Sequence, residues 1–184
     1  IEAANKCEAR ALMIAAFNGQ KEVCELLIEK GANVNLKNNW ENTPLHITAQ
    51  RGHLDTCKLL LQKGSDITAK GNDGDTPLHC AAIGGFTEIC GILLGKGASL
   101  DTENNNGDTP LAIGVKKGHL DVCRLLIEKG PDVTGMQGAQ LLQLAIDKGN
   151  TEIKDLLIEK GAVLSSEDED AKGYLYRLTG CSLL

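Results

Sequence analysis

The chain has 184 residues, of which 42% are hydrophobic and only 3% aromatic, and its formal net charge at pH 7 is −6. Its 19 basic residues are scattered along an acidic chain, which argues against nucleic acid as the main ligand. No run of about 18 apolar residues occurs, and no charged segment leads into an apolar one, so the sequence itself shows neither a membrane span nor a secretion signal. Ile1 is not a natural start, which is compatible with a piece of a longer chain.

The most regular feature of the chain is a pair of glycines that recurs every 33 residues, with a fifth pair after 31. The first glycines are Gly19, Gly52, Gly85, Gly118 and Gly149, and the second are Gly31, Gly64, Gly97, Gly130 and Gly161. This period indicates a repeat protein of five units, with two residues lost between the fourth unit and the fifth.

Each unit predicts two helices. Outer helices are expected over residues 22–30, 54–63, 88–96 and 120–129, where apolar residues recur at helical spacing and a closing glycine suits a left-handed conformation. Shorter inner helices open with Thr-Pro-Leu-His at 43–46 and 76–79 and with Thr-Pro-Leu-Ala at 109–112. Threonine caps a helix and proline suits its first position.

These motifs resemble the ankyrin repeat, since Thr-Pro-Leu-His, Ala-Ala-x-x-Gly, Leu-Leu-x-x-Gly-Ala and Asn-Gly-Asp-Thr-Pro all occur in phase over about residues 5–164. The resemblance implies an all-α solenoid of stacked antiparallel helix pairs with projecting β-hairpin-like loops. Within a domain of residues 1–164, the repeats are expected at about 5–37, 38–70, 71–103, 104–136 and 137–164. Units one and five depart from the motif at residues 10–13 and 141–143, as units at the ends of an array often do.

Four of the seven cysteines occupy one equivalent outer-helix position in successive units: Cys24, Cys57, Cys90 and Cys123. Stacked helices lie about 8–10 Å apart, which exceeds the ~7 Å limit for a disulfide, and no Cys-x-x-Cys or His-x-x-x-His spacing occurs. We interpret these residues as buried free thiols rather than disulfides or zinc ligands. Free thiols predict a reducing compartment, so the protein is expected in the cytoplasm, with the nucleus as the alternative.

All four histidines lie at repeat positions, and the resemblance implies that His46 and His79 tie neighbouring loops together by hydrogen bonds. No phosphate-binding glycine loop, His-Glu-x-x-His motif or Ser/His/Asp arrangement occurs. The chain is therefore predicted to be non-catalytic and to need no metal or cofactor.

Proteins that this chain resembles bind other proteins through a concave face made of loop tips and inner helices. The variable positions of that face are the predicted partner-binding residues. They are Asn39, Trp40, Asn42, Ile47, Arg51, Asn72, Asp73, Asp75, Cys80, Ile83, Asn105, Asn106, Asp108, Ile113 and Lys116.

Trp40 is the only tryptophan and lies at a loop tip, where Glu41 replaces the glycine of the next two loops. Two interpretations fit: an interface hot spot, whose truncation commonly costs ~2 kcal/mol, or an indole folded over its own loop. The tips are also acidic, at Glu41, Asp73, Asp75, Glu103 and Asp108. These carboxylates would either steer a Lys/Arg-rich peptide or form a solvated rim.

Two features predict a weak joint between units four and five. Gly114 stands where alanine is usual in an inner helix, at a cost of up to ~1 kcal/mol. Residues 134–139 are expected to be a shortened, glycine-rich loop.

Residues 165–184 are predicted to form a capping helix, over 167–178, and a tail. Ser165 and Ser166 precede acidic residues, which suits a capping box or, alternatively, phosphorylation by an acid-directed kinase. Residues 181–184 match the Cys-a-a-X signal for prenylation of Cys181 if Leu184 ends the protein. The alternative is an unmodified end. One prenyl group would anchor the chain only weakly.

The sequence thus predicts a monomeric, non-catalytic scaffold or adaptor that binds a protein or peptide, preferably basic, through its concave face. One alternative is a membrane-tethered, prenylated adaptor or a microbial effector. The other is a regulatory or targeting module of a larger enzyme.

Overall fold

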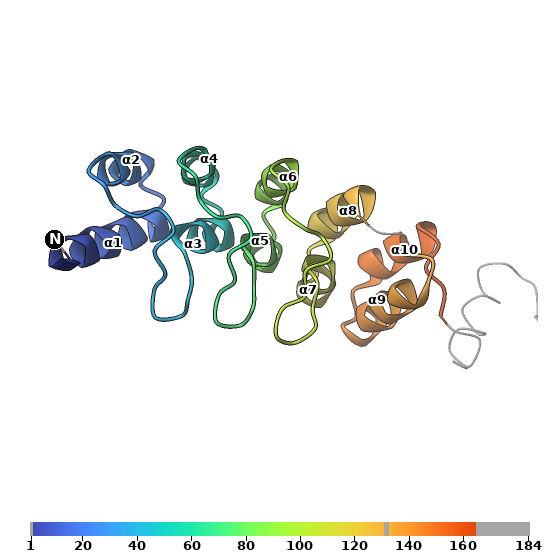
Figure 1. Ribbon diagram of the computed structural model, residues 1–184. Helices are drawn as coiled ribbons and strands as arrows, with labels where there is room; N and C mark the ends of the chain where they lie inside the picture. The colour runs from blue at the N-terminus through green and yellow to red at the C-terminus, as the bar shows by residue number, and fades with distance from the viewer. Residues whose placement is uncertain (1, 131–132, 165–184) are drawn as a thin grey trace, which may run out of the picture.

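The computed structural model describes residues 2–130 and 133–164, with side chains from residue 10 onward. Within these ranges ten helices and no strands occur, and the helices form antiparallel pairs stacked in one row (Figure 1). The expected all-α solenoid of helix pairs is confirmed. The tail predictions, namely the helix over 167–178, Ser165, Ser166 and Cys181, lie outside the described residues.

The two helices of each pair form two parallel rows (Figure 1). The inner helices are α1 (Glu2–Phe17), α3 (Pro44–Arg51), α5 (Pro77–Gly84), α7 (Pro110–Lys117) and α9 (Met136–Asp147). The outer helices are α2 (Lys21–Glu29), α4 (Leu54–Gln62), α6 (Thr87–Gly95), α8 (Leu120–Lys129) and α10 (Thr151–Glu159). None of the described helices is both long enough and apolar enough to cross a membrane.

The Thr-Pro pairs begin the inner helices as predicted. Thr43, Thr76 and Thr109 have extended backbones and are followed by proline at the first helical position. The Thr109 hydroxyl oxygen accepts the Ala112 backbone N–H at 3.3 Å. Proline is tolerated there because the first N–H groups of a helix have no intrahelical partner.

The fifth inner helix differs from the prediction, since α9 begins at Met136 and the expected loop over 134–139 is wrong. This helix has 12 residues, against eight for α3, α5 and α7. No proline occurs from residue 132 to residue 164, and residues 139–145 are mostly good helix formers. The chain therefore enters the helix early, from the extended residue Gly135.

One helix end also departs from the expected left-handed glycine. Gly31, Gly64, Gly97 and Gly161 have φ between 88° and 99°, but Gly130 has φ −117° and ψ −155°. The prediction for Gly130 is wrong because the connection to the fifth unit is shorter, and the chain leaves α8 extended instead of turning back.

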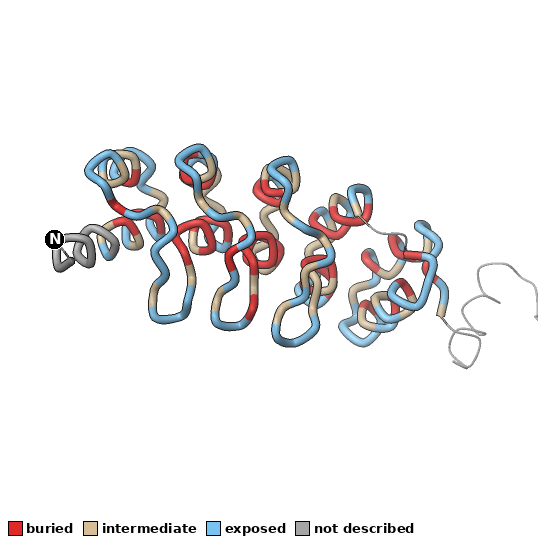
Figure 2. Tube along the Cα trace, viewed as in Figure 1, coloured by how far each residue is buried: buried red, intermediate tan, exposed pale blue. Residues whose placement is uncertain are grey.

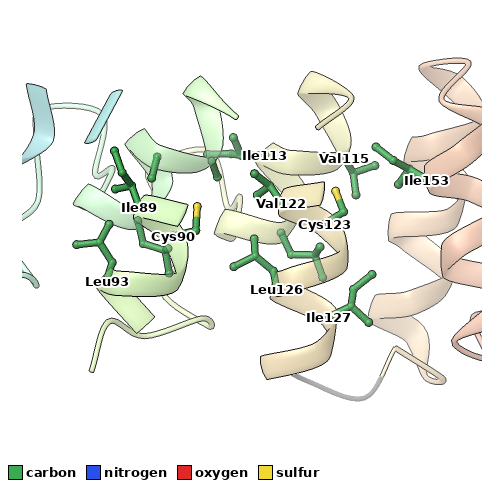
Figure 3. Packing of buried hydrophobic residues seen from close by; sticks show 14 of the residues in the cluster. Ile89, Cys90, Leu93, Ile113, Val115, Val122, Cys123, Leu126, Ile127 and Ile153 are labelled. Carbon is green, nitrogen blue, oxygen red and sulfur yellow. The ribbon is translucent and has the colours of Figure 1, made fainter. Parts of the chain in front are cut away.

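The core lies between the two helix rows and runs through the array (Figure 2). Leu45, Leu78 and Leu111, each following a Thr-Pro pair, are buried at equivalent positions. Figure 3 shows Cys90 and Cys123 within this layer of aliphatic side chains. Small and branched side chains suffice because each layer is only one helix pair thick.

The cysteines of the outer helices are buried and free, as predicted. Burial raises the pKa of the Cys24 and Cys57 thiols to about 11 and of the Cys90 and Cys123 thiols to about 12. These thiols are therefore neutral at physiological pH and act as small apolar core residues.

The joint between units four and five contains two buried glycines. A β-carbon at Gly114 would lie 3.1 Å from the Cys123 sulfur, and one at Gly138 would collide with the Val133 carbonyl oxygen. Gly114 is therefore packed closely against α8 of its own unit, and Gly138 against the segment that precedes α9. The weakness of this joint stays a prediction.

We expect Gly138→Ala to lower the free energy of unfolding by about 1–3 kcal/mol, because a backbone carbonyl cannot move aside as a side chain does. Urea denaturation followed by circular dichroism would measure the change. Gly95→Ala is the matched control, because a β-carbon there would meet nothing within 4 Å, and it should leave stability unchanged or raise it by up to ~1 kcal/mol. Equal stability of the two variants would contradict the packing argument.

Candidate functional site

Three loops project from the same side of the inner-helix row (Figure 1). We name them loop A (residues 36–43), loop B (69–76) and loop C (102–109), which precede α3, α5 and α7. Together with these helices they form what we call the loop face. The loop face contains the loop tips and inner helices from which the predicted partner-binding residues come.

Each loop is closed by a backbone hydrogen bond across its base, as in a β-hairpin. The N–H groups of Asn38, Gly71 and Asn104 donate to carbonyls four residues further on, at 2.9–3.0 Å. In loop A the Asn38 side-chain oxygen also accepts the N–H groups of Trp40 and Asn42. Such Asx contacts hold a turn without any apolar core of its own.

Neighbouring loops are joined to one another in a fixed register. The Asn72 N–H donates to the Trp40 carbonyl at 3.0 Å, and one unit later the Asn105 N–H donates to the Asp73 carbonyl at 2.9 Å. The Lys70 ammonium group donates to the Glu103 backbone carbonyl at 3.0 Å. In the same way the Lys37 ammonium group donates to the Lys70 backbone carbonyl at 3.0 Å. Each loop thus fixes the position of the one before it.

Two buried imidazoles link helix caps to loops, in the role that the resemblance implied. Nδ1 of His46 accepts the Thr43 N–H at 3.1 Å, so the neutral ring carries its proton on Nε2, which donates to the Asp75 carbonyl at 3.1 Å. His79 repeats this arrangement with Thr76 and the Asp108 carbonyl. Both contacts leave the loop tips free for other contacts.

Trp40 is held by its backbone but not by its ring. Its N–H and carbonyl are both hydrogen-bonded, whereas the residue is 69% exposed. The interpretation in which the indole folds over its own loop is therefore wrong. Next to it, Glu41 takes up the left-handed conformation of a glycine, with φ 56°, and pairs with Lys37 at 3.2 Å.

A groove of about 220 Å³ opens beside Trp40, between loops A and B. It is lined by Trp40, Asn42, Gln50, Asn72, Asp73, Asp75, Cys80 and Ile83. All but Gln50 are sequence-predicted partner-binding residues. Gln50 lies three residues after Ile47 in α3, and this helical spacing could have identified it.

Two predicted contact residues do not belong on the surface. Cys80 and Ile113 are each only 5% exposed, because they lie on inner helices at positions covered by the neighbouring pair. They are corrected from partner-binding to core residues, although Cys80 contributes to the floor of the groove.

The remaining predicted residues are on the loop face but outside the groove. Asn39, Asn105 and Asn106 are exposed, and Ile47 is half-buried. The guanidinium of Arg51 lies 3.8 Å from the centre of the Phe17 ring. Lys116 pairs with Asp108 at 2.6 Å.

The acidic residues of the tips have different surroundings. Asp75 accepts the Asn104 side-chain amide at 2.8 Å, and Asp108 pairs with Lys116, so both have a structural partner. Asp73 is exposed, and within the described ranges no side chain donates to its carboxylate. Burial raises the pKa of the Cys80 thiol to about 12, and the nearby carboxylates of Asp75 and Asp73 add to this increase.

Among the described residues, no cluster of three or more His, Cys, Asp or Glu side chains is arranged to hold a metal ion. A family model for ankyrin repeats matches the chain in three copies, over residues 1–71, 69–137 and 100–170. Comparison with curated proteins gives no significant match.

The loop face should lose stability as pH falls below 6.5. Burial lowers the pKa of His46 and His79 below their ordinary value of 6.5, so the unfolded chain takes up these protons first. The contribution of each histidine to the free energy of unfolding is fully present above pH 6.5. It falls by up to about 1.4 kcal/mol per pH unit as the pH drops toward the lowered pKa. Urea midpoints at pH 7.5, 6.5 and 5.5 would measure this.

The control is the double variant His46→Gln, His79→Gln. It should be less stable at pH 7.5 but should show a shallower pH dependence in this window. An unchanged slope would assign the pH dependence to other groups.

Proposed function

The chain belongs to the ankyrin repeat family, whose repeats are in general protein-protein interaction modules, and from this membership we propose a non-catalytic scaffold or adaptor that binds a protein or peptide on its loop face. The observation that carries the proposal is the exposed indole of Trp40 at the edge of a groove. A large aromatic side chain held at a rigid tip gives much contact area at little entropic cost.

The groove beside Trp40 favours a basic partner segment. The carboxylate of Asp73 has no side-chain partner within the described ranges, and the face of a tryptophan ring attracts an ammonium or guanidinium group. Ile83, half-buried in the same groove, offers apolar surface to the aliphatic stem of a lysine or arginine. The net charge of −6 would speed the approach of such a segment.

The polar lining suits a peptide rather than a small apolar ligand. Asn42, Gln50 and Asn72 present amide groups, each of which both donates and accepts hydrogen bonds and so matches peptide backbone. The loops are already joined to one another, so little order would have to be created on binding. This supports recognition of an extended segment across loops A and B.

The cytoplasm, or alternatively the nucleus, is the proposed location, and a monomer the proposed state. The location is supported by the free thiols of Cys24, Cys57, Cys80, Cys90 and Cys123, which suit a reducing compartment.

Trp40 fluorescence provides a direct test, since this is the only tryptophan in the chain. An array of basic, neutral and acidic 12-residue peptides would first be screened with the protein, and binders would then be titrated by fluorescence. We expect basic peptides to bind best and to shift the emission. Trp40→Ala, followed by calorimetry, should weaken binding about 30-fold, equivalent to ~2 kcal/mol.

Asp73→Asn should weaken binding of basic peptides and reduce its dependence on salt. Asn39→Ala is the matched control, because Asn39 is exposed in the same loop but does not line the groove. Binding that survives Trp40→Ala with unchanged affinity, or a screen without any binder, would refute the proposed surface.

A further inference from the structure

The ladder of hydrogen bonds between loops stops at loop C. The carbonyls of Trp40 and Asp73 each accept an N–H from the following loop. Asn106 is the third equivalent residue, 33 positions after Asp73, and no hydrogen bond to its carbonyl occurs within the described ranges. Its own N–H is used within the loop, on the Asn104 side chain. Loop C thus presents an unpaired acceptor where loops A and B have a partner.

The reason lies in the shortened fifth unit. Only residues 130–135 connect α8 to α9, whereas the longer segments 30–43, 63–76 and 96–109 precede α3, α5 and α7 and carry the projecting loops of Figure 1. The sequence is consistent with this loss, since Ala112 replaces the histidine that in α3 and α5 donates to the next loop.

The glycines at the loop tips show directly that loop B is covered by the next loop and that loop C is not. A β-carbon at Gly74 in loop B would lie 2.8 Å from the backbone nitrogen of Asn105, because loop C covers it. At Gly107, the equivalent residue of loop C, such an atom would meet nothing within 4 Å. The side of loop C that faces the fifth unit is therefore open at its tip.

A groove of about 210 Å³ lies against this open side, between loop C and α9. Its apolar lining is Leu100, Leu111, Leu141 and Leu144, of which only Leu111 is fully buried. The exposed residues Asp101 and Glu103 line it as well. No described group donates a hydrogen bond or forms an ion pair with either carboxylate.

We propose that the open side of loop C and this groove form a second protein-binding site, in which an extended segment of a partner protein takes the place of the missing fifth loop. A backbone N–H of the segment donates to the Asn106 carbonyl, in the register of Asn72 and Asn105. An apolar side chain enters the leucine-lined groove, and a lysine or arginine faces Asp101 and Glu103.

An extended segment fits because the array itself shows what covers this surface. At both equivalent places the backbone of the following loop lies alongside and donates an N–H to the carbonyl. A peptide added to an unpaired backbone edge reproduces that contact. The acidic residues select a basic flank by charge complementarity. A second copy of this chain is a poorer occupant, because both copies carry a net charge of −6.

This site is separate from the Trp40 groove. The groove beside Trp40 lies between loops A and B, and the two grooves share no lining residue. Variants can therefore test them one at a time.

The probe is a phage-displayed library of random 12-residue peptides, selected on the Trp40→Ala variant of the full chain so that binders of the first groove are disfavoured. We expect enrichment of peptides with an apolar residue beside lysine or arginine. In NMR titrations these should shift the amides of Asn106 and Gly107 and the methyl groups of Leu141 and Leu144.

Asp101→Lys with Glu103→Lys should weaken these peptides at least 10-fold. The matched control is Asp121→Lys with Glu128→Lys, which makes the same charge change at exposed positions of α8. Leu144→Glu should also abolish binding. If this change unfolds the protein, the surface variant Asp101→Lys with Glu103→Lys still tests the proposal.

Four results would overturn the proposal, three from the peptide experiments and one from self-association. The first is a selection that enriches no peptide, and the second is an equal loss of peptide affinity in the two double variants. The third is a set of NMR shifts confined to loops A and B, which would leave only the proposed first site. Self-association of the wild type that Asp101→Lys with Glu103→Lys abolishes would also overturn it, by assigning the surface to a second copy.

Discussion

The loop face depends on a buried imidazole that donates to the carbonyl of the next loop. His46 and His79 each accept a threonine N–H at a helix start and reach across to Asp75 and Asp108. One ring thus fixes both the beginning of a helix and the position of a neighbouring loop. Because the ring is buried and neutral, the contact needs no ion pair and leaves the exposed side chains of the tips free to vary.

This division of roles explains where function is found in a chain made of copies. The core positions repeat, as Leu45, Leu78 and Leu111 show, because every layer has to fill the same narrow space. The tips do not carry that constraint. Trp40, Asp73 and the open side of loop C are all places where one unit differs from its neighbours, and they are the places where the surface offers a contact that the scaffold does not use.

Acidic residues near the tips illustrate why composition alone is a poor guide to a binding surface. Asp108 is paired with Lys116 and Asp75 accepts from Asn104, so both help to hold the loops. Asp73, Asp101 and Glu103 have no such side-chain partner within the described ranges. Only these three carry charge that a partner can meet without first breaking an internal contact.

The sequence by itself determined the repeat, the helix pairs, the Thr-Pro helix starts and the ladder of buried thiols, because each depends on local preference or on a strict period. It also identified all but one of the residues that line the Trp40 groove, since variable positions in a repeat project from known places. Tertiary structure alone decided that Cys80 and Ile113 are buried, that α9 begins at Met136 and that Gly130 is extended. It alone decided, too, that Asp75 has a partner and that the Asn106 carbonyl has none. These properties depend on what the neighbouring unit places against a residue, and a shortened fifth unit changes that neighbour without changing the residue itself.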